Sequence, residues 1–382
     1  MKLYLIAGEA SGDARGAELM RALRERLPAI EFFGAGGREM RALAGDHLED
    51  WADEAVVGLW DVLKKYGYFR KQFDRMLGEI GQLQPDAVLF IDYPGFNLRL
   101  AKALRAGHPK LRLFYYISPQ VWAWNRGRIP KMARFLDLML CIFPFEKPLY
   151  EESGLRTVFV GHPMLDTLAS RRLGLTREND LAALLPGSRE KEVRKIFPVM
   201  IEAAKLLRAR HPLLRFATSA ASPALGDLMR QQLRDAGCDE TFCAIGLRNS
   251  HELMQRAAAG LVASGTATLE AAFFGLPFAL LYRVAWLTWV IGKRLVRVPF
   301  LGMPNILAGR EIVREFLQDA AQPEPIASHL ERMLTDAEFA AHIQRDLAGV
   351  IAQLGEGGAA TRAAEALAEE FGRGGVNSGG EV

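Results

Sequence analysis

The sequence of 382 residues is poor in cysteine, with Cys141, Cys238 and Cys243 alone, and no pair of them has CxxC spacing. Three cysteines cannot all pair with one another, so a disulfide framework is disfavoured and a reducing compartment is indicated. The seven histidines are scattered without ligand spacing, and no two aspartates stand two residues apart. We therefore expect neither a bound metal nor a cofactor.

An excess of charge of one sign is also lacking. The 48 Lys and Arg residues nearly balance the 45 Asp and Glu residues, for a formal net charge of +3, so no chain-wide basic field indicates a nucleic-acid partner. No segment has 18 consecutive uncharged apolar residues, which argues against a membrane span. The first residues, MKLYLIAGEASGD, are typical of a strand rather than of a secretion signal. These absences predict a cytoplasmic protein.

The chain does have a regular alternation of short β-branched or aromatic runs with amphipathic stretches. This pattern predicts parallel sheets with crossover helices. A polar stretch at residues 166–180 separates two such series. In the first series we expect strands at residues 2–7, 30–34, 87–92, 112–117, 138–143 and 157–160 and helices at 14–27 and 97–106. In the second we expect strands at 181–185, 213–219, 241–245, 261–264 and 278–282 and helices at 324–334, 336–354 and 359–371.

The fold class that follows is α/β, with two Rossmann-like, doubly wound parallel-sheet domains facing a central crevice. Ligands of such sheets bind at the carboxyl ends of the strands. We place the N-terminal domain at residues 1–170 and the C-terminal domain at 180–355. The glycine-rich segment 372–382 is expected to be disordered.

The strongest chemical motif is LLPGSREKEV, in which a strand runs through Pro186 into a helix. Gly187 and Ser188 would present free amide groups at a helix N-terminus, and Arg189 would add a bidentate donor, which together suit a diphosphate. The alternative is an ordinary helix start with Ser188 as the N-cap.

A second motif, ASGTATLE, also joins a strand end to a helix through Ser264 and Gly265. Thr266 and Glu270 are four residues apart and share one helical face, so the carboxylate could accept both hydroxyl hydrogens of a ribose. The alternative is a surface glutamate. Two such loops in the same half of the chain favour a bound nucleotide.

In the N-terminal half, IDYPGFN places Asp92 at a strand end, where a partly desolvated carboxylate could act as a general base. The alternative is that Asp92 and Asn97 cap the turn and the helix. The motif GEASGD makes Glu9 and Asp13 available for polar contacts with a substrate. GAGG at residues 34–37 lacks the later glycine of a dinucleotide fingerprint, so a nicotinamide cofactor is rejected.

Two amphipathic segments, residues 56–80 and 286–300, interleave aromatic residues with Lys and Arg. This pattern fits either a core-facing helix or a membrane contact. The membrane candidates are Trp60, Leu63, Phe69, Phe73, Trp286 and Trp289.

Taken in order, the motifs resemble lipid-A-disaccharide synthase, the bacterial glycosyltransferase that joins two acylated glucosamines. The resemblance covers roughly residues 1–320 and is specific because nine motifs occur in register. They are GEASGD, IDYPGFN, SPQVWAW, PFEKPLYE, GHPMLD, LLPGSREKEV, ASGTATLE, YRV and PNILAGREIV.

The resemblance implies two Rossmann-like domains of the B-type glycosyltransferase kind, with helices after about residue 355 returning to the first domain. The donor would be UDP-2,3-diacylglucosamine and the acceptor 2,3-diacylglucosamine 1-phosphate. The acceptor would be held on the N-terminal side, where Glu9, Ser11 and Ser118 lie. The expected catalytic base is Asp92. The expected UDP-sugar contacts are Gly187, Ser188, Arg189, Ser264, Gly265, Thr266, Glu270 and Asn305.

The mechanism implied is an inverting displacement that needs no metal, with release of UDP and formation of a β-1,6 link. Because both substrates carry acyl chains, we expect the protein at the inner face of the cytoplasmic membrane, in contact with anionic lipids. The alternatives are a UDP-N-acetylglucosamine 2-epimerase and a non-catalytic lipid- or nucleotide-binding protein.

Overall fold

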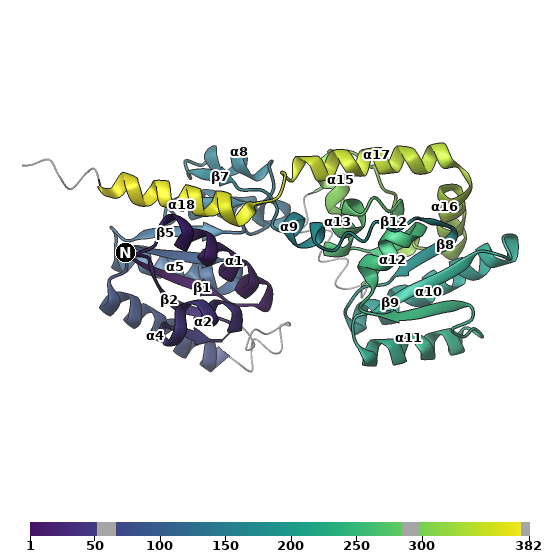
Figure 1. Cartoon of the computed structure of the whole chain (residues 1–382), viewed down its shortest axis with the longest axis horizontal. Coiled ribbons are helices and arrows are strands. Elements are labelled where there is room, and N and C mark those ends of the chain that lie inside the picture. The colour runs from purple at the N-terminus through teal and green to yellow at the C-terminus, as the bar shows by residue number, and fades with distance from the viewer. Residues whose placement is uncertain (52–65, 285–297, 376–382) are drawn as a thin grey trace, which may run out of the picture. The chain divides into compact units, whose positions relative to one another are not determined.

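The computed structural model describes residues 1–51, 66–284 and 298–375, and the chain divides into two compact units (Figure 1). Unit 1 comprises Met1–Asp166 together with the C-terminal stretch from Leu354, and unit 2 comprises Thr167–Gln353. Each unit has its own parallel sheet, as the alternation of strands and helices in the sequence predicts.

Unit 1 is built on a seven-stranded sheet of order β3-β2-β1-β4-β5-β6-β7, and every strand pair is parallel. The strands are β1 (Lys2–Ala7), β2 (Glu31–Gly36), β3 (Leu48–Asp50), β4 (Ala87–Ile91), β5 (Arg112–Tyr116), β6 (Leu138–Cys141) and β7 (Thr157–Phe159). The helices are α1 (Ala10–Arg26), α2 (Arg38–Ala44), α4 (Tyr66–Leu83), α5 (Pro94–Gly107), α6 (Val121–Trp124), α7 (Ile129–Met132), α8 (Glu146–Glu151), α9 (Met164–Ala169) and α18 (Ala359–Gly375), with 3-10 turns at Gly45–His47 and Arg126–Arg128.

Helix α18, the last described element, packs on α1 of unit 1 (Figure 1). Arg26 of α1 pairs with Glu365, and the ring of Phe371 meets Phe114 edge-on at 5.9 Å. The Arg112 guanidinium donates to the Glu370 carbonyl at 3.0 Å. The C-terminal helix therefore contributes to the core of the N-terminal unit.

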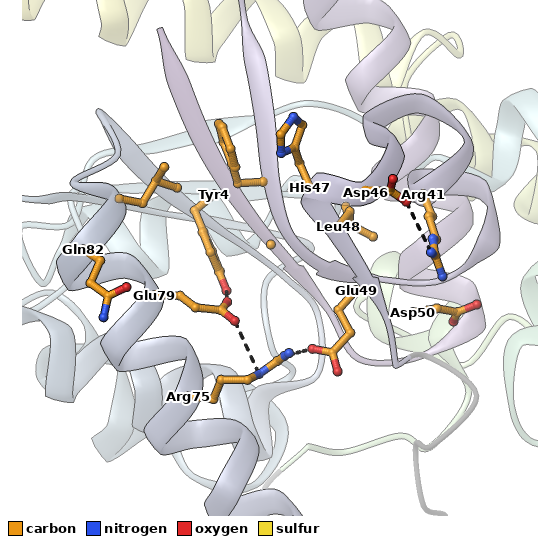
Figure 2. A pocket seen from close by; sticks show the side chains of 13 residues that line it. Tyr4, Arg41, Asp46, His47, Leu48, Glu49, Asp50, Arg75, Glu79 and Gln82 are labelled. Carbon is orange, nitrogen blue, oxygen red and sulfur yellow. Dashed lines mark hydrogen bonds and ion pairs between the residues drawn. The ribbon is translucent and has the colours of Figure 1, made fainter.

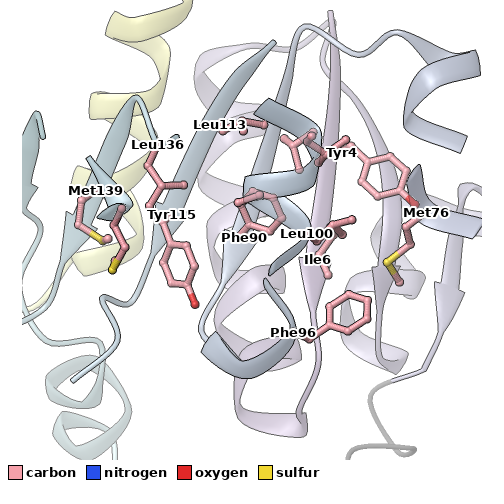
Figure 3. Close-up of a cluster of buried hydrophobic side chains, with 14 of the residues drawn as sticks. Tyr4, Ile6, Met76, Phe90, Phe96, Leu100, Leu113, Tyr115, Leu136 and Met139 are labelled. Atoms are coloured by element: carbon pink, nitrogen blue, oxygen red, sulfur yellow. The ribbon is translucent and has the colours of Figure 1, made fainter. Parts of the chain in front are cut away.

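The core of unit 1 lies between its sheet and the helices on one face, where Phe90, Tyr115 and Leu100 are fully buried (Figure 3). Apart from Lys2 and Arg112 at the first positions of β1 and β5, the central strands β1, β4 and β5 consist of buried, largely apolar residues, because helices cover both faces of a parallel sheet. Each such side chain contributes about 1.5–3 kcal/mol through burial. This packing gives the loops at the strand ends a rigid base.

Unit 2 has a six-stranded parallel sheet of order β10-β9-β8-β11-β12-β13. The strands are β8 (Glu178–Leu185), β9 (Arg215–Ala220), β10 (Cys243–Leu247), β11 (Ala257–Ala263), β12 (Phe278–Tyr282) and β13 (Glu315–Leu317). The helices are α10 (Glu190–Arg210), α11 (Pro223–Asp235), α12 (Ser250–Arg256), α13 (Thr266–Phe273), α15 (Met303–Ala308), α16 (Pro323–Thr335) and α17 (Ala337–Gln353), with a 3-10 turn at Gln318–Ala320.

Both sheets start in the middle and wind outward in two directions. In unit 1 the direction changes between β1 and β4, and in unit 2 between β8 and β11. At such a switch point the loops after the two neighbouring strands turn to opposite faces of the sheet, which opens a crevice at the carboxyl ends. The topology therefore defines one candidate ligand site in each unit.

The structure differs from the sequence expectation in several elements. Strands β3 and β13, of three residues each, were not expected, and α1 begins at Ala10 rather than at residue 14. Helix α18 continues to Gly375, so the expectation of disorder from residue 372 is wrong for residues 372–375. Residues 376–382 lie outside the described residues.

The first amphipathic segment is in part a core-facing helix. In α4, Met76 and Ile80 are buried, and the rings of Phe69 and Phe73 lie 6.5 and 5.9 Å from the ring of Phe96. Of the two alternatives, the core-facing helix fits Phe69 and Phe73, because both are partly buried against the core of unit 1, and a membrane contact of this segment stays a prediction. The other membrane candidates, Trp60, Leu63, Trp286 and Trp289, lie outside the described residues.

Candidate active site

The switch point of unit 1 brings Glu9 and Asp92 to the same edge of the sheet. In the β1–β4 pair Ala7 is opposite Ile91, and these are the last residues of their strands. Glu9 follows β1 as the N-cap residue of α1, and Asp92 directly follows β4. Ser11, in the first turn of α1, is exposed beside Glu9. Two carboxylates thus lie at the crevice that the topology predicts.

Asp92 and the next residue, Tyr93, both have left-handed backbone conformations, with φ of 47° and 51°. Such conformations in non-glycine residues cost on the order of 1–3 kcal/mol each and occur where neighbouring contacts impose them. Here the Asp92 N–H donates to Tyr116 at 2.9 Å, and the Asp92 carbonyl accepts from the Tyr115 hydroxyl at 2.6 Å and from the Asn97 amide at 2.7 Å. These bonds hold Asp92 in a strained turn.

The electrostatics at Asp92 favour a base that operates near neutral pH. Burial raises the pKa of its carboxyl from 3.8 to about 6, the negative charge of Glu9 adds to the rise, and a hydrogen bond from the Tyr93 backbone opposes it. A carboxylate with this pKa is ionised at pH 7 yet more basic than an ordinary aspartate. Asp92 therefore has the properties expected of a general base.

The structure also tests the alternative role of Asp92 and Asn97 as caps. Tyr93, not Asp92, is the N-cap residue of α5, and no side chain caps this helix. The Asn97 amide donates to backbone carbonyls, with Asp92 as its shortest contact. Asn97, in the first turn of α5, thus stabilises the turn at Asp92, and the Asp92 side chain does not serve as a helix cap.

Asp13, expected to contact a substrate, has a structural role instead. It is buried, and its carboxylate accepts hydrogen bonds from the backbone N–H groups of Gly37, Glu39 and Met40 at 2.8, 2.9 and 3.0 Å. These groups lie at the N-terminus of α2, where a carboxylate satisfies unpaired donors. The sequence expectation for Asp13 is therefore wrong.

Ser118 lies one strand further along the same edge. It follows Ile117, whose φ of 65° is unusual for a β-branched residue and indicates a second strained turn beside Asp92. Ser118 is buried beside Glu146, whose carboxylate accepts from the Trp122 indole at 2.8 Å and from the Phe143 backbone at 3.1 Å. Burial raises the pKa of Glu146 to about 7, and the hydrogen bonds from Trp122 and from the Phe143 backbone oppose the rise. Ser118 therefore belongs to the buried support of the loop.

In unit 2 the switch point joins the two loops singled out in the sequence. Val262 of β11 is opposite Leu185 of β8, so the Gly187 loop and the Gly265 loop leave the sheet side by side. Gly187 has a φ of 109° and Gly265 a φ of 145°, both of which favour glycine. Each loop leads into a helix, α10 or α13, so backbone N–H groups at two helix starts lie at one crevice.

At the first of these loops the N-cap residue of α10 is Arg189 rather than Ser188, and no side chain caps the helix. Ser188 and Arg189 are exposed, and the Arg189 guanidinium donates to the Glu192 carboxylate at 3.1 Å. A side chain at Gly187 would collide with that same carboxylate. Glu192 thus lies where the sequence predicts a diphosphate, and an incoming anion would have to displace it.

At the second loop, Ser264 is held by a backbone bond to Leu281 at 3.0 Å, and Thr266, at the start of α13, is exposed. The Thr268 hydroxyl donates to the Gly265 carbonyl at 2.7 Å and fixes the turn. Glu270 is half-buried one helical turn beyond Thr266. Thr266 and Glu270 therefore lie one turn apart on α13, and the contact of Glu270 with a ribose stays a prediction.

His251 is a candidate site residue that the sequence analysis missed. Its Nε2 lies 3.1 Å from Glu270 Oε2, and its Nδ1 lies 3.1 Å from the Arg171 guanidinium. Because arginine can only donate, Nδ1 accepts and Nε2 carries the proton that is donated to Glu270. The Gln255 side-chain amide donates to the Arg171 carbonyl at 3.0 Å and so helps to hold Arg171 in place. The chain Arg171–His251–Glu270 therefore fixes one oxygen of the carboxylate.

Asn305 does not have a free side chain. It is fully buried, its Nδ2 donates to Val313 at 2.8 Å and to Glu315 at 2.9 Å, and its Oδ1 accepts from Ile312 at 2.8 Å and from Val313 at 3.0 Å. Two donors and two acceptor positions exhaust an amide. In this arrangement Asn305 shapes the loop before β13, and the predicted direct contact with UDP is not available to it.

His162, in the GHPMLD motif, is a partly buried histidine that packs within unit 1. Burial lowers its pKa to about 4, with a further contribution from Arg15, so the ring is neutral at pH 7. Its Nδ1 accepts from the Met164 backbone at 3.1 Å, and the ring packs on Phe143 at 5.2 Å. Among the described residues, no three His, Cys, Asp or Glu side chains are placed to hold a metal ion.

A cavity of about 750 Å³ lies away from both switch points, between β2, β3 and α4 (Figure 2). The Tyr4 hydroxyl donates to Glu79 at 2.6 Å, and Arg75 pairs with Glu79 and Glu49. Most of the charged side chains that line this cavity form ion pairs or hydrogen bonds with one another. None of the predicted site residues lines the cavity. This cavity is not the candidate active site.

Comparisons with known proteins agree on one family. The family model described as lipid-A-disaccharide synthetase matches residues 3–371. A lipid-A-disaccharide synthase of Trichlorobacter lovleyi is 41% identical over 372 residues, which are 95% of this chain and 96% of the relative. A second, of Geobacter metallireducens, is 39% identical over 97% of this chain and 98% of the relative.

Two solved structures resemble the chain in fold. One is the UDP-GlcNAc 2-epimerase of Neisseria meningitidis bound to UDP-GlcNAc, with a TM-score of 0.61, 12% identity and coverage of 97% of this chain and 100% of that one. The other is MurG of Acinetobacter baumannii, with a TM-score of 0.57, 11% identity and coverage of 96% and 99%. At these identities the likeness concerns the fold, and the fold is that of B-type glycosyltransferases and their epimerase relatives.

Proposed function

The chain belongs to the lipid-A-disaccharide synthase family, and we propose that the two switch-point sites divide its reaction between them. The protein is a UDP-sugar-dependent glycosyltransferase of lipid A biosynthesis. It transfers 2,3-diacylglucosamine from UDP to 2,3-diacylglucosamine 1-phosphate, forms a β-1,6 link and releases UDP. In our proposal unit 1 holds the acceptor and supplies the base, and unit 2 holds the nucleotide.

The single observation that carries the assignment of the base is the environment of Asp92. Its carboxyl combines a pKa of about 6 with a backbone fixed by Tyr115, Tyr116 and Asn97. Asp92 would accept the proton of the acceptor's 6-hydroxyl while that oxygen attacks the anomeric carbon from the side opposite UDP. Glu9 would keep Asp92 basic and, with Ser11, make polar contacts to the acceptor sugar.

The departing diphosphate would be held in unit 2. The amides at Gly187 and Ser188, the N-terminus of α10 and the Arg189 guanidinium can offset its negative charge. Arg189 would exchange its partner Glu192 for the diphosphate, and Ser264, Gly265 and Thr266 would provide the adjoining wall. Glu270, held by His251, would accept hydrogen bonds from the ribose hydroxyls.

A two-substrate turnover assay with mass analysis of the products tests this function. The proposal predicts UDP and a disaccharide 1-phosphate in equal amounts, and only when donor and acceptor are both present. A 2-epimerase would convert the UDP-sugar without acceptor, and a non-catalytic binder would release no UDP in any mixture. Either outcome would overturn the proposal.

We also propose that the protein works at a membrane surface, because both substrates carry acyl chains that partition into a bilayer. Within the part of the chain that the structure describes, no helix is long and apolar enough to cross a membrane. Association would therefore be peripheral, at the inner face of the cytoplasmic membrane. Basic residues contribute about 1 kcal/mol each at an anionic surface, and salt weakens the contribution.

Liposome flotation at low and high salt tests the membrane proposal. We expect the protein to float with anionic vesicles at low salt and to be released at high salt. If it remains in solution with anionic vesicles at low salt, the acyl substrates must reach the enzyme in another way.

A further inference from the structure

The crossover between β5 and β6 carries four cations that form no ion pair with any acid of the described residues. From Ser118 to Leu136 the chain contains Arg126, Arg128, Lys131 and Arg134 and no Asp or Glu. Within the described structure none of the four takes part in a recorded ion pair, whereas Arg105, in the neighbouring α5, pairs with Asp137 at 2.6 Å. Unpaired cations clustered on one segment are candidates for binding an anion.

The inner side of this crossover is firmly attached to unit 1. Val121, Trp122 and Ile129 are buried, and the Trp122 indole donates to the buried Glu146 at 2.8 Å. The Tyr150 hydroxyl donates to the Pro119 carbonyl at 3.1 Å. The side chains that point outward are therefore carried on a fixed base, which reduces the entropy lost when they bind a ligand.

Trp124 and Arg128 form a platform on the outer side. The Trp124 side chain is 42% exposed, and the Arg128 guanidinium lies over its ring at 4.7 Å. Stacking uses the face of the guanidinium and leaves its in-plane N–H groups free for a phosphate. Arg126, two residues away and exposed, adds a second set of donors.

The position of the platform relates it to Asp92. Its segment starts at the carboxyl end of β5, and Ile91 and Tyr116, the last residues of β4 and β5, are register partners. Asp92 follows Ile91, and Ile117 follows Tyr116. The base and the start of this segment therefore lie at the same edge of the sheet. Arg134 lies towards the opposite edge, because the crossover there approaches β6 and the Phe135 carbonyl is bound by Arg105.

We propose that Arg126 and Arg128, supported by Trp124, bind the phosphate monoester of the acceptor and so orient its 6-hydroxyl towards Asp92. This inference rests on the proposed function. Arginine forks match phosphate oxygens bidentately and distinguish a phosphate from a neutral sugar. A membrane headgroup fits less well, because the apolar residues of the crossover face the core and leave Trp124 without an apolar stripe for insertion.

The test compares Arg126→Gln, Arg128→Gln and the double variant with Arg134→Gln, which removes an exposed cation of the same crossover that likewise forms no ion pair among the described residues. Turnover is measured in neutral detergent micelles with two acceptors, one carrying the 1-phosphate and one with a methyl group in its place. UDP affinity is measured by calorimetry on the same preparations.

We expect the double variant to raise KM for the phosphorylated acceptor by about one to two decades, which corresponds to losing charge-assisted hydrogen bonds. Its kcat for the phosphorylated acceptor should also fall, because the bound phosphate no longer orients the 6-hydroxyl, whereas its UDP affinity should stay within about twofold of the parent and its KM for the methylated acceptor should be unchanged. Arg134→Gln should resemble the parent with both acceptors.

Three results would overturn the inference: an unchanged KM for the phosphorylated acceptor, an equal loss with both acceptors, or a loss that appears only with substrate in anionic vesicles. The last would assign the arginines to membrane headgroups. If the parent protein forms no product at all, the proposed function fails. Binding of an acceptor with a fluorescent acyl chain to neutral micelles containing each variant then still decides whether the arginines recognise phosphate.

Discussion

Glu9→Gln should shift the pH dependence of the enzyme in a defined direction. The pKa of Asp92 is raised from 3.8 to about 6, first by burial and then by the charge of Glu9. At pH 7 about nine-tenths of a carboxyl with a pKa of 6 is ionised, and at pH 5 about one-tenth. If Asp92 is the base, kcat/KM should fall about tenfold per pH unit below pH 6.

Removing the negative charge of Glu9 stabilises the ionised form of Asp92 and lowers its pKa. The acid limb of the Glu9→Gln profile should therefore move to lower pH, and its midpoint should remain above 3.8 because Asp92 is still buried. The variant should retain more of its maximal activity at pH 5 than the parent does. Above pH 7 it should be somewhat slower if Glu9 also contacts the acceptor.

The assay is a series of kcat/KM measurements from pH 4.5 to 8.5 on the parent, Glu9→Gln and the control Glu25→Gln. Glu25 is exposed near the other end of the same helix, so its removal changes the net charge equally. We expect the control profile to coincide with that of the parent. Two results would refute the proposed electrostatics of Asp92. One is that the parent's kcat/KM profile has no acid limb near pH 6, and the other is that Glu9→Gln does not move this limb.

Three further predictions concern the nucleotide site and the strained turn. Arg189→Ala should weaken UDP binding by about one to two decades in calorimetry. The control Arg194→Ala, which removes a similar ion pair with Glu190 in the same helix, should leave UDP affinity unchanged. If Arg189→Ala binds UDP as tightly as the parent, the Gly187 loop is not the diphosphate site. His251→Ala and Glu270→Gln should both reduce the preference for UDP over its 2′,3′-dideoxy analogue. If either variant keeps the parent's preference, the His251–Glu270 pair does not recognise the ribose hydroxyls. Tyr115→Phe removes the 2.6 Å hydrogen bond to the Asp92 carbonyl and should lower the free energy of unfolding by about 1 kcal/mol in urea titrations. The variant should also have a lower kcat, with UDP affinity intact. An unchanged kcat would mean that this hydrogen bond does not position the base.

The central strands could be predicted from the sequence because each contains an apolar run of at least five residues. The predicted strand 2–7 coincides with β1, and the predicted strand 278–282 with β12. The three-residue strands β3 and β13 were missed because they include the charged residues Glu49, Asp50 and Glu315. Their strand conformation depends on pairing with a neighbouring strand, which composition does not reveal.

The motif loops before α10 and α13 were correctly predicted to join a strand to a helix, because such a motif marks a strand's carboxyl end, and their role in binding stays a prediction. The function of single residues within them was harder to predict. Asp13 and Asn305 are residue types that often bind ligands, but in this structure their side chains bind backbone groups of other segments. The Gly37 amide that binds Asp13 is 24 residues away, and no local pattern announces it.

Two features of the site have no signal in the sequence at all. His251 is 19 residues from Glu270, so neither helical nor strand spacing relates them. The left-handed backbone at Asp92 and Tyr93 occurs at residues other than glycine and is imposed by tertiary hydrogen bonds. Both features follow from packing, and both contribute to the proposed chemistry.

The most direct test of the account is the turnover of Asp92→Asn, measured together with its UDP affinity. Asparagine has nearly the same shape and tolerates the left-handed backbone, but it cannot accept the proton. The account predicts that turnover of both acylated substrates falls by about 10² to 10⁴ while UDP binds as tightly as to the parent. Near-normal turnover in this variant would contradict the assignment of Asp92 as the general base.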